Sequence, residues 1–216
     1  MRTKKARYIA VEGPIGVGKS SLVTLLGERF GAEPVFEKVA ENPFLESFYG
    51  DMGQYAFQTQ IFFLVSRHKQ LSSLSQTELF NRVTLCDYVL ERDLIFARLN
   101  LSEDEFRLYI DIYNLLRRRI PKPDLVVYLQ AETPTLLKRI RRRNRDIERN
   151  VSEGYIDQVN KAFNEFFFSY REGPLLIINT NSIDFVANEE DFEKLVAKVT
   201  GEVKGTEFFN PLGSAG

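Results

Sequence analysis

Four short runs of apolar, β-prone residues recur along the chain, and longer segments with helical periodicity separate them. The four runs span residues 8–12, 82–87, 125–130 and 175–179. Runs that are apolar at almost every position are typical of parallel strands that helices cover on both faces. A shorter strand is expected at residues 35–36, so the pattern predicts a sheet of about five parallel strands.

The segments between these runs predict helices. Helices are expected over residues 55–71, 102–120, 133–143, 152–170 and 189–203. The second of them begins with Ser102 followed by three acidic residues, which is typical of an N-cap and first turn. Strands that alternate with helices in this way predict a doubly wound α/β fold, here as one domain over residues 1–204. Residues 205–216 are expected to form an irregular C-terminal tail.

One segment carries a phosphate-binding motif. Residues 13–20 satisfy G-x-x-x-x-G-K-[ST] and lie between a predicted strand and a predicted helix, as this motif requires. Glycines let the backbone direct its N–H groups at phosphate oxygens, while Lys19 adds a positive charge and the Ser20 hydroxyl can bind Mg²⁺. The pattern predicts a P-loop fold with a loop that binds ATP and Mg²⁺ through Gly13, Pro14, Ile15, Gly16, Val17, Gly18, Lys19, Ser20 and Ser21.

Composition narrows the class of P-loop protein. The 29 basic and 30 acidic residues nearly balance, which argues against a nucleic-acid partner, and no apolar run has the length of a membrane span. The chain has no Asn/Thr-Lys-x-Asp motif of the kind that reads guanine, and 216 residues leave no room for the extra domains of a motor. A small-molecule kinase is therefore expected. The single cysteine, Cys86, and the absence of a signal-peptide pattern predict the cytoplasm.

The chain resembles the deoxynucleoside kinases over residues 8–199. The most specific parts are the stretch from Glu37 through Asn42-Pro-Phe-Leu to Tyr49 and an arginine-rich segment at residues 138–145. The resemblance implies an enzyme that transfers the γ-phosphoryl group of ATP to the 5′-hydroxyl of a deoxynucleoside with the help of Mg²⁺. It also implies a homodimer. The sequence itself offers for this only aromatic helical faces that suit a core equally well: Phe163, Phe166, Phe167 and Tyr170.

The resemblance implies roles for individual acceptor-side residues. Glu37 is expected to hydrogen-bond the 5′-hydroxyl and help remove its proton, and Tyr49 to hold the 3′-hydroxyl. Asp87 ends the third predicted strand, at residues 82–87, which follows the strands at residues 8–12 and 35–36. An acid at this place in a P-loop protein usually acts on Mg²⁺ or on the acceptor hydroxyl. The family has an arginine directly after this acid, whereas this chain has Tyr88. Either Arg92 replaces that arginine or the arginine-rich segment carries more of the charge. A surface helix charge is the alternative for Arg92.

The helix expected over residues 55–71 offers groups that can read a base. Gln60 and Arg67 are seven residues apart and therefore project from one helix face. Gln58 points elsewhere and is the alternative if the helix is distorted. In the resembling family the base-reading glutamine has this spacing to an arginine. Asp93 is expected to pair with Arg67, as a similar pair does in relatives that accept cytosine and purines. The resemblance therefore favours deoxyadenosine, deoxyguanosine or deoxycytidine over thymidine.

The densest basic cluster, residues 138–145, resembles the lid of the same family, placed at about residues 139–151. Arg139 and Arg143 are four residues apart and share a helix face. Together with Arg145 they are expected to close over the ATP phosphates and stabilise the charge of the transferring group. A solvated helix face is the alternative.

Two further sites follow from the resemblance. Glu148 is expected to contact the sugar, and the loop at Asp184 and Phe185 to lie against the adenine ring. Two other functions stay open from the sequence. A nucleoside monophosphate kinase of the thymidylate-kinase type needs acceptor-side arginines, for which only Arg67 and Arg92 are available. A nucleotide-binding regulatory module without transfer activity is the second.

Overall fold

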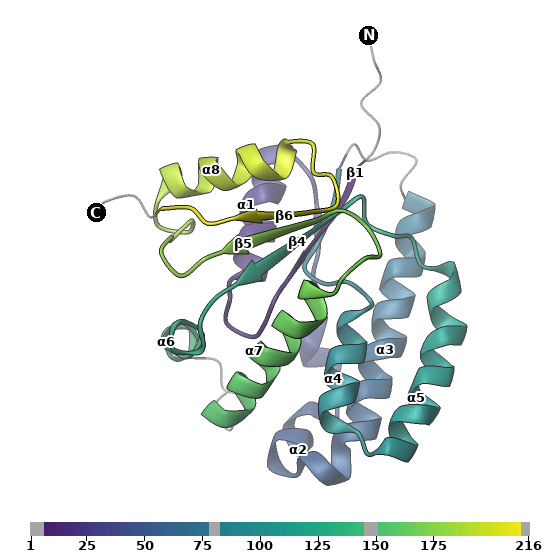
Figure 1. Cartoon of the computed structure of the whole chain (residues 1–216). Coiled ribbons are helices and arrows are strands. Elements are labelled where there is room, and N and C mark those ends of the chain that lie inside the picture. Colours follow the sequence, from purple (N-terminus) through teal and green to yellow (C-terminus); the bar gives the residue numbers. More distant parts are fainter. Residues whose placement is uncertain (1–6, 78–82, 145–150, 213–216) are drawn as a thin grey trace.

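A six-stranded parallel sheet forms the centre of the molecule (Figure 1). The computed structural model describes residues 7–77, 83–144 and 151–212. The strand order is β2-β3-β1-β4-β5-β6. β2 and β3 thus lie on one side of β1 and β4 to β6 on the other, so the sheet has a topological switch point at β1. Ligands bind at such a switch point, in the crevice beyond the carboxyl ends of the strands. The strands are β1 (Arg7–Glu12), β2 (Pro34–Val35), β3 (Val83–Cys86), β4 (Leu125–Gln130), β5 (Leu175–Asn179) and β6 (Thr206–Phe209).

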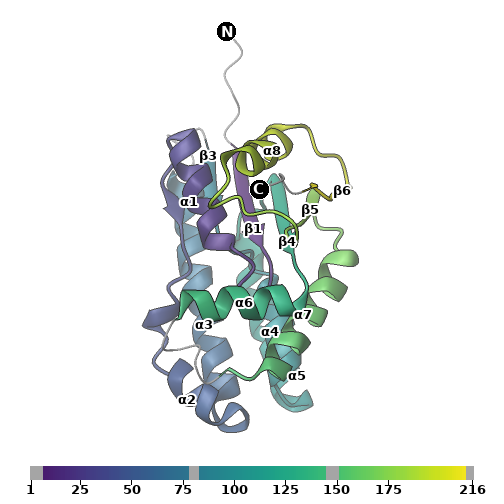
Figure 2. The same ribbon diagram turned by 90° about the vertical axis from the view of Figure 1, so that its left-hand side faces the viewer.

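Helices cover both faces of the sheet (Figures 1 and 2). One face packs against α1 (Lys19–Phe30) and α8 (Glu189–Thr200). The other packs against α3 (Met52–Thr77), α4 (Arg92–Asn100), α5 (Glu103–Leu116) and α7 (Glu153–Phe168). The short α2 (Leu45–Gly50) packs on α3, and α6 (Thr133–Arg143) crosses the end of the sheet beside α7. Two 3₁₀ turns complete the described part: η1 (Val39–Glu41) and η2 (Arg117–Arg119).

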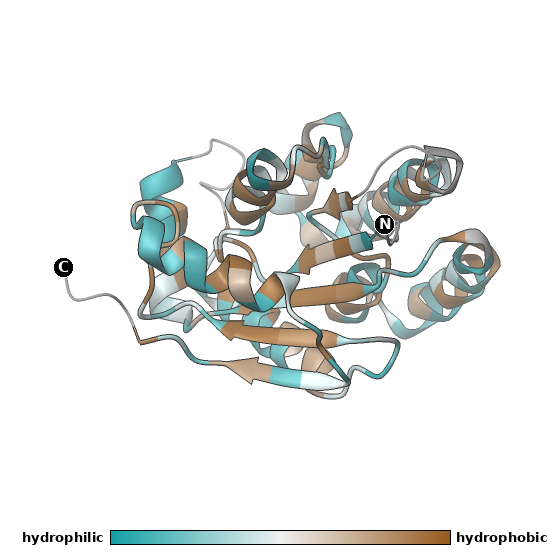
Figure 3. Cartoon of the chain, turned by 90° about the horizontal axis from the view of Figure 1, so that it is seen from above, coloured by the Kyte–Doolittle hydropathy of each residue, from teal (hydrophilic) through white to brown (hydrophobic). Residues whose placement is uncertain are grey.

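The strands divide their side chains between two cores because successive side chains of a strand point to opposite faces. In β1, Tyr8 and Ala10 join the core under α3, α4, α5 and α7. Ile9 and Val11 join the core under α1 and α8. Seen from above, the apolar strands form a layer between helices whose outer faces are hydrophilic (Figure 3). The predicted doubly wound α/β fold is confirmed.

Several predicted elements agree closely with the structure. The helix predicted over residues 133–143 has those bounds, and Ser102 caps α5 in a capping box with Glu105. Phe163 and Phe167 are fully buried in the core, so the core interpretation of that aromatic face is correct for both. Within the described residues, none of the helices combines the length and apolar character needed to cross a bilayer.

The irregular tail predicted for residues 205–216 is wrong over Thr206–Phe209, which form β6 and pair with β5. This four-residue strand lies at the edge of the sheet and has one half-buried face, so its composition carries little signal. Helix α4 was not predicted either. It begins with Arg92 and Asp93, which are buried although charged, so the usual separation of polar and apolar faces is missing.

Candidate active site

The phosphate-binding loop follows β1 and leads into α1, whose first residue is Lys19. Gly13 has φ +150°, and a Cβ atom there would lie 2.5 Å from the carbonyl oxygen of Leu129 in β4. Gly18 has φ +109°, and a Cβ atom there would meet the ring of Phe185 at 3.0 Å. Both positions require glycine, because backbone conformation and space exclude a side chain. The loop therefore has the close backbone wrap that a phosphate cradle needs.

Lys19 lies inside this loop. Its Nζ atom donates hydrogen bonds to the carbonyl oxygens of Gly13 at 2.7 Å and Pro14 at 3.0 Å. Burial and the nearby charge of Arg92 lower the pKa of Lys19 from its ordinary 10.5 to about 7, although neighbouring carboxylates act in the opposite direction. The ammonium group is thus poorly solvated, and a bound phosphate anion would stabilise its charge.

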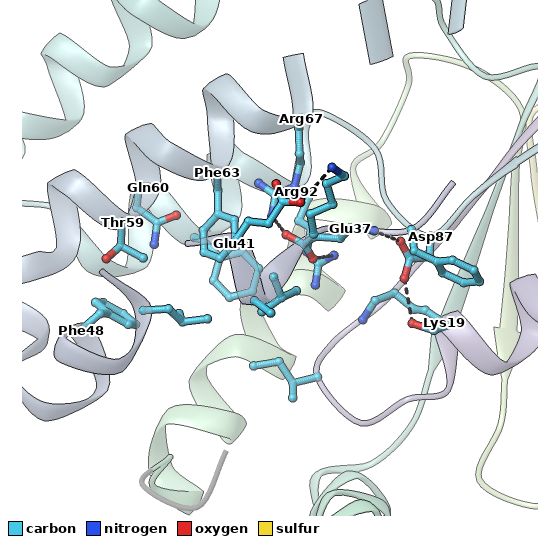
Figure 4. Close-up of a pocket in the computed structure, with 18 of the residues that line it drawn as sticks. Lys19, Glu37, Glu41, Phe48, Thr59, Gln60, Phe63, Arg67, Asp87 and Arg92 are labelled. Carbon is cyan, nitrogen blue, oxygen red and sulfur yellow. Dashed lines mark hydrogen bonds and ion pairs between the residues drawn. The ribbon is translucent and has the colours of Figure 1, made fainter. Parts of the chain in front are cut away.

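A cavity of about 630 Å³ opens in front of the loop, which is a usual size for a small-molecule site. Figure 4 shows Lys19 and Asp87 at one end of the cavity and Gln60 at the other, with Glu37 between them. The carboxylate-bearing strand ends and the phosphate loop therefore face one common space. The remaining lining is mostly apolar or aromatic and includes Ile15, Phe36, Val39, Leu45, Phe48, Tyr49, Phe63, Phe96 and Tyr155.

Glu37 lies between two guanidinium groups. One carboxylate oxygen accepts a hydrogen bond from Nη2 of Arg67, and the other accepts one from Nη1 of Arg92 at 3.0 Å. Burial raises the pKa of the Glu37 carboxyl, but Arg67, Arg92 and Lys19 outweigh it, so the pKa lies below its ordinary value. Glu37 is therefore an anion at neutral pH. Arg67 also pairs with Asp93, as predicted, through Nη1.

Arg92 is 6% exposed, so the alternative of a surface helix charge is wrong. Its hydrogen bond to Glu37 brings it to the centre of the cavity, which it lines together with Arg67. Tyr88, where the resembling family has arginine, is fully buried and donates a hydrogen bond to Oε1 of Gln70 at 3.0 Å. Arg92 is thus an arginine beside the Glu37 carboxylate.

Asp87 connects the phosphate loop to the acceptor side. Its Oδ2 atom accepts a hydrogen bond from the Ser20 hydroxyl at 2.7 Å, and its Oδ1 atom accepts one from the Glu37 backbone N–H at 2.8 Å. Hydroxyl and carboxylate oxygens are the protein ligands that Mg²⁺ uses beside nucleotide phosphates. The described residues contain no cluster of three or more His, Cys, Asp or Glu suited to a metal. The oxygen atoms of Ser20 and Asp87 would fit a Mg²⁺ ion that takes its remaining ligands from nucleotide phosphates and water.

The far end of the cavity is formed by α2 and α3. Gln60 is 3% exposed and lines the cavity, and its amide has no hydrogen-bond partner within the described part of the chain. Gln58 is exposed, so the structure selects Gln60, as the helical spacing predicted. An amide that can both donate and accept suits the edge of a base. Tyr49 also lines the cavity, and its hydroxyl role stays a prediction.

The lid residues lie over a second, smaller cavity of about 210 Å³ beside the phosphate loop. The Arg139 guanidinium donates to the Val17 carbonyl at 3.2 Å and to the Thr180 carbonyl at 2.7 Å. Arg143 lines both cavities. Asp184 and Phe185 line the smaller cavity, and their contact with adenine stays a prediction. Two predicted residues, Arg145 and Glu148, lie outside the described residues.

Comparison with known proteins decides what this combination of sites represents. The family model described as "Deoxynucleoside kinase" matches residues 9–204. The chain belongs to the deoxynucleoside kinase family. The deoxyguanosine kinase of Bacillus subtilis is 37% identical over 199 residues, which cover 90% of this chain and 96% of that protein. The deoxyadenosine kinase of Lactobacillus acidophilus is 28% identical over 212 residues, which cover 92% of this chain and 97% of that protein.

A solved structure agrees with the fold of this deoxynucleoside kinase. The structure of a deoxyadenosine kinase from M. mycoides with bound dATP is similar with a TM-score of 0.77 and 28% sequence identity. The match covers 90% of this chain and 100% of that one. The predicted family is therefore confirmed, and with it an enzyme that transfers phosphoryl groups at the expense of ATP.

Sequence reasoning missed two buried polar residues of this deoxynucleoside kinase. Glu12, the last residue of β1, is 0% exposed and accepts two backbone hydrogen bonds. Its signal was a lone acid at the end of an otherwise apolar strand. Thr59 precedes Gln60 in α3, lines the cavity, and has a buried hydroxyl without a partner in the described residues. No sequence signal distinguishes it from an ordinary helix threonine.

Proposed function

We propose that this deoxynucleoside kinase transfers the γ-phosphoryl group of ATP to the 5′-hydroxyl of a purine deoxynucleoside, with deoxyguanosine and deoxyadenosine as its main acceptors. One observation carries the proposal. The anionic Glu37 lies in the same cavity as Lys19 of the phosphate loop, and that cavity ends at the Gln60 amide, which has no hydrogen-bond partner among the described residues. The relatives named as deoxyguanosine and deoxyadenosine kinases support the choice of purines.

The residues of the cavity support a division of roles. Gln60 and the Arg67–Asp93 pair face the base, and Tyr49 and Glu148 hold the sugar. Glu37 accepts the proton of the 5′-hydroxyl, and Asp87 orients Glu37 through its backbone N–H. Protein groups supply positioning and charge stabilisation, because phosphoryl transfer needs little covalent help.

On the donor side, too, the protein is proposed to position the phosphates and stabilise their charge. Lys19 holds the β- and γ-phosphates, and the arginines of the lid, Arg139, Arg143 and Arg145, stabilise the negative charge of the transferring group. Asp184 and Phe185 lie against adenine. Ser20 and Asp87 would hold Mg²⁺, which neutralises phosphate charge when it is bound.

A nucleoside monophosphate kinase finds little support in the geometry. Its acceptor phosphate needs unpaired arginines, whereas Arg67 pairs with Glu37 and Asp93, and Arg92 pairs with Glu37. Displacing either carboxylate would leave a buried charge without its partner, which costs several kcal/mol by a rough general measure. We therefore propose the free nucleoside as the acceptor.

A panel of acceptors tests the proposal. The protein is assayed for ATP consumption with Mg²⁺ and each of the four deoxynucleosides, their 5′-monophosphates, and no acceptor. Turnover is expected with deoxyguanosine and deoxyadenosine and is expected to be lowest with thymidine. Preferential turnover of monophosphates would refute the acceptor, and ATP binding without any turnover would indicate a regulatory module instead.

The assembly and compartment are also proposals. Leu108 and Leu115 are seven residues apart on α5 and are 52% and 69% exposed, which supports the homodimer that the family resemblance implies. A monomeric mass in light scattering at micromolar concentration would refute it. The lone buried cysteine, Cys86, supports a cytoplasmic enzyme.

A further inference from the structure

Glu12 is an acidic residue at a buried position, and this burial raises the pKa of its carboxyl above the ordinary value. It is the last residue of β1, and its side chain is completely buried, whereas the four residues before it are buried and uncharged. Burying a carboxylate is costly unless hydrogen bonds and opposite charges compensate for the lost water. A leucine or valine at this position would continue the strand at no such cost. The groups that hydrogen-bond to the buried Glu12 carboxylate therefore indicate its role.

Each carboxylate oxygen of Glu12 accepts one backbone hydrogen bond. Oε2 accepts from the N–H of Gly13 at 2.9 Å, and Oε1 accepts from the N–H of Val89 at 2.9 Å. Neither N–H belongs to the sheet ladder, because β1 ends at Glu12 and β3 ends at Cys86. The carboxylate thus connects two loops, and the sheet does not need it for its own pairing.

The two loops belong to opposite halves of the reaction. Gly13 is the first residue of the phosphate-binding loop. Val89 lies in the segment of residues 87–91 between β3 and α4, which begins with Asp87 and leads directly to Arg92. The charges of Arg92 and Lys19 act against the effect of burial and favour the Glu12 carboxylate. The carboxylate therefore contacts the donor loop on one side and, on the other, the segment that lies between Asp87 and Arg92.

We propose that Glu12 is a positioning residue for phosphoryl transfer, a clamp that holds the phosphate-binding loop in register with Asp87 and Arg92. The clamp acts through backbone atoms and contacts neither substrate. Misplacing a reacting group by about 1 Å can reduce a rate by about 10²-fold, so a shift between these two loops should affect turnover more than binding. The inference rests on the kinase activity proposed above.

The decisive variant is Glu12→Gln. Glutamine has the same shape but only one acceptor oxygen, so its NH₂ group must face either the Gly13 N–H or the Val89 N–H. We expect kcat to fall by about 10-fold to 10²-fold, while KM for the deoxynucleoside stays within about 3-fold of the wild-type value. Amide resonances of Gly13 and Val89 in ¹⁵N-edited spectra are expected to move, because one of their hydrogen bonds is lost.

Two further variants separate positioning from simple stability. Glu12→Asp keeps the charge but is one methylene too short to reach both loops, so it is expected to lose kcat as well. The control is Asp124→Asn, since Oδ2 of Asp124 accepts the Tyr8 N–H at 2.9 Å at the opposite end of the same strand. This control is expected to lower the melting temperature and leave kcat unchanged.

Several outcomes would overturn the proposal. These are a Glu12→Gln kcat within about 3-fold of wild type, an equal loss of kcat in Asp124→Asn, or full activity in Glu12→Asp. Failure of both Glu12 variants to fold would overturn it too, because the residue would then act on stability. A wild-type protein that phosphorylates no deoxynucleoside would instead refute the proposed function, whatever the amide resonances of the variants show.

Discussion

At the scale of single residues, the acceptor side is a compact set of paired charges. Glu37 binds Arg67 and Arg92, and Arg67 also binds Asp93. The two guanidinium groups keep the Glu37 carboxylate ionised. They also fix its orientation, because each carboxylate oxygen accepts a hydrogen bond from one of them. The carboxylate can accept a proton from a hydroxyl only where its remaining lone pairs face the cavity. Its orientation is therefore as important as its charge.

Replacing the carboxylate tests its place in the reaction. Glu37→Gln should keep deoxynucleoside binding nearly intact, because Gln60 and the base end of the cavity are unchanged. Turnover should fall by about 10²-fold to 10⁴-fold, the usual contribution of a general base. Steady-state kinetics and calorimetric binding give the two quantities. Glu33→Gln, an exposed acid just before β2, is the matched control and should behave as wild type. Near-normal turnover of Glu37→Gln would remove Glu37 from the mechanism.

Lys19 leads to a pH prediction. Its pKa is lowered to about 7 in the free protein, and bound phosphates favour the charged ammonium, so the pKa rises on ATP binding. Above about pH 7 binding must take up a proton, and ATP affinity should fall by up to about tenfold per pH unit towards pH 9. Calorimetry in buffers of different ionisation enthalpy measures this uptake. In Lys19→Arg the guanidinium does not titrate, so its affinity should be nearly independent of pH. A wild-type protein without proton uptake would contradict the prediction.

At the scale of elements, α1 has a glycine in a positive-φ conformation at each end. Gly18 precedes its first turn and Gly31 follows its last, with φ +109° and +61°. The first end is crowded by Phe185, whereas a Cβ atom at Gly31 would meet nothing within 4 Å. Gly18 is thus constrained by its backbone conformation and by the packing of Phe185, and Gly31 only by its backbone conformation.

A pair of alanine substitutions separates these two requirements. Gly13→Ala would place a methyl group against the Leu129 carbonyl, which β4 holds in place, so the loop must move. ATP affinity should fall by about 10²-fold or more, while deoxynucleoside binding persists. Gly31→Ala has open space and should cost only about 1–2 kcal/mol of unfolding free energy, with unchanged ATP affinity. Binding isotherms and thermal unfolding measure both effects. Equal ATP affinity in the two variants would contradict the assignment of the loop.

At the scale of the whole molecule, β6 forms the edge of the sheet opposite to β2. It pairs with the outer side of β5, whose backbone groups there would otherwise have no strand partner. Phe209 packs onto the core under α1 and α8, and the Lys198 ammonium lies 5.2 Å from its ring centre. Phe208 points away and is 63% exposed. The segment after α8 is therefore part of the folded domain.

Neighbouring phenylalanines of β6 offer a matched test. Phe209→Ala should lower the free energy of unfolding by about 2 kcal/mol, which is less than the loss for a fully buried phenylalanine. Phe208→Ala should stay within about 0.5 kcal/mol of wild type. Chemical denaturation measures both values. Equal effects would show that β6 contributes no packing, and kcat should be unaffected in either variant because the strand lies away from the acceptor cavity.

The amino-acid sequence alone determined the phosphate loop, the sheet-and-helix class and the choice of Gln60 over Gln58. These features depend on local spacing: a loop motif between a strand and a helix, apolar periodicity, and the angle between residues of one helix. Such relations hold before any distant parts of the chain meet. The tail was misread because a short, half-exposed edge strand gains its stability from β5 and not from its own residues.

Only the tertiary structure decided how the charges are arranged. Arg92 appeared compatible with a surface helix, and Glu12 was merely the end of a strand, until folding brought α3, α4 and the phosphate loop around them. A buried charge is tolerated only where another element supplies its partner, and that partner is distant in sequence. Glu12 and Val89, for instance, are 77 residues apart. Their contact is a property of the assembled fold.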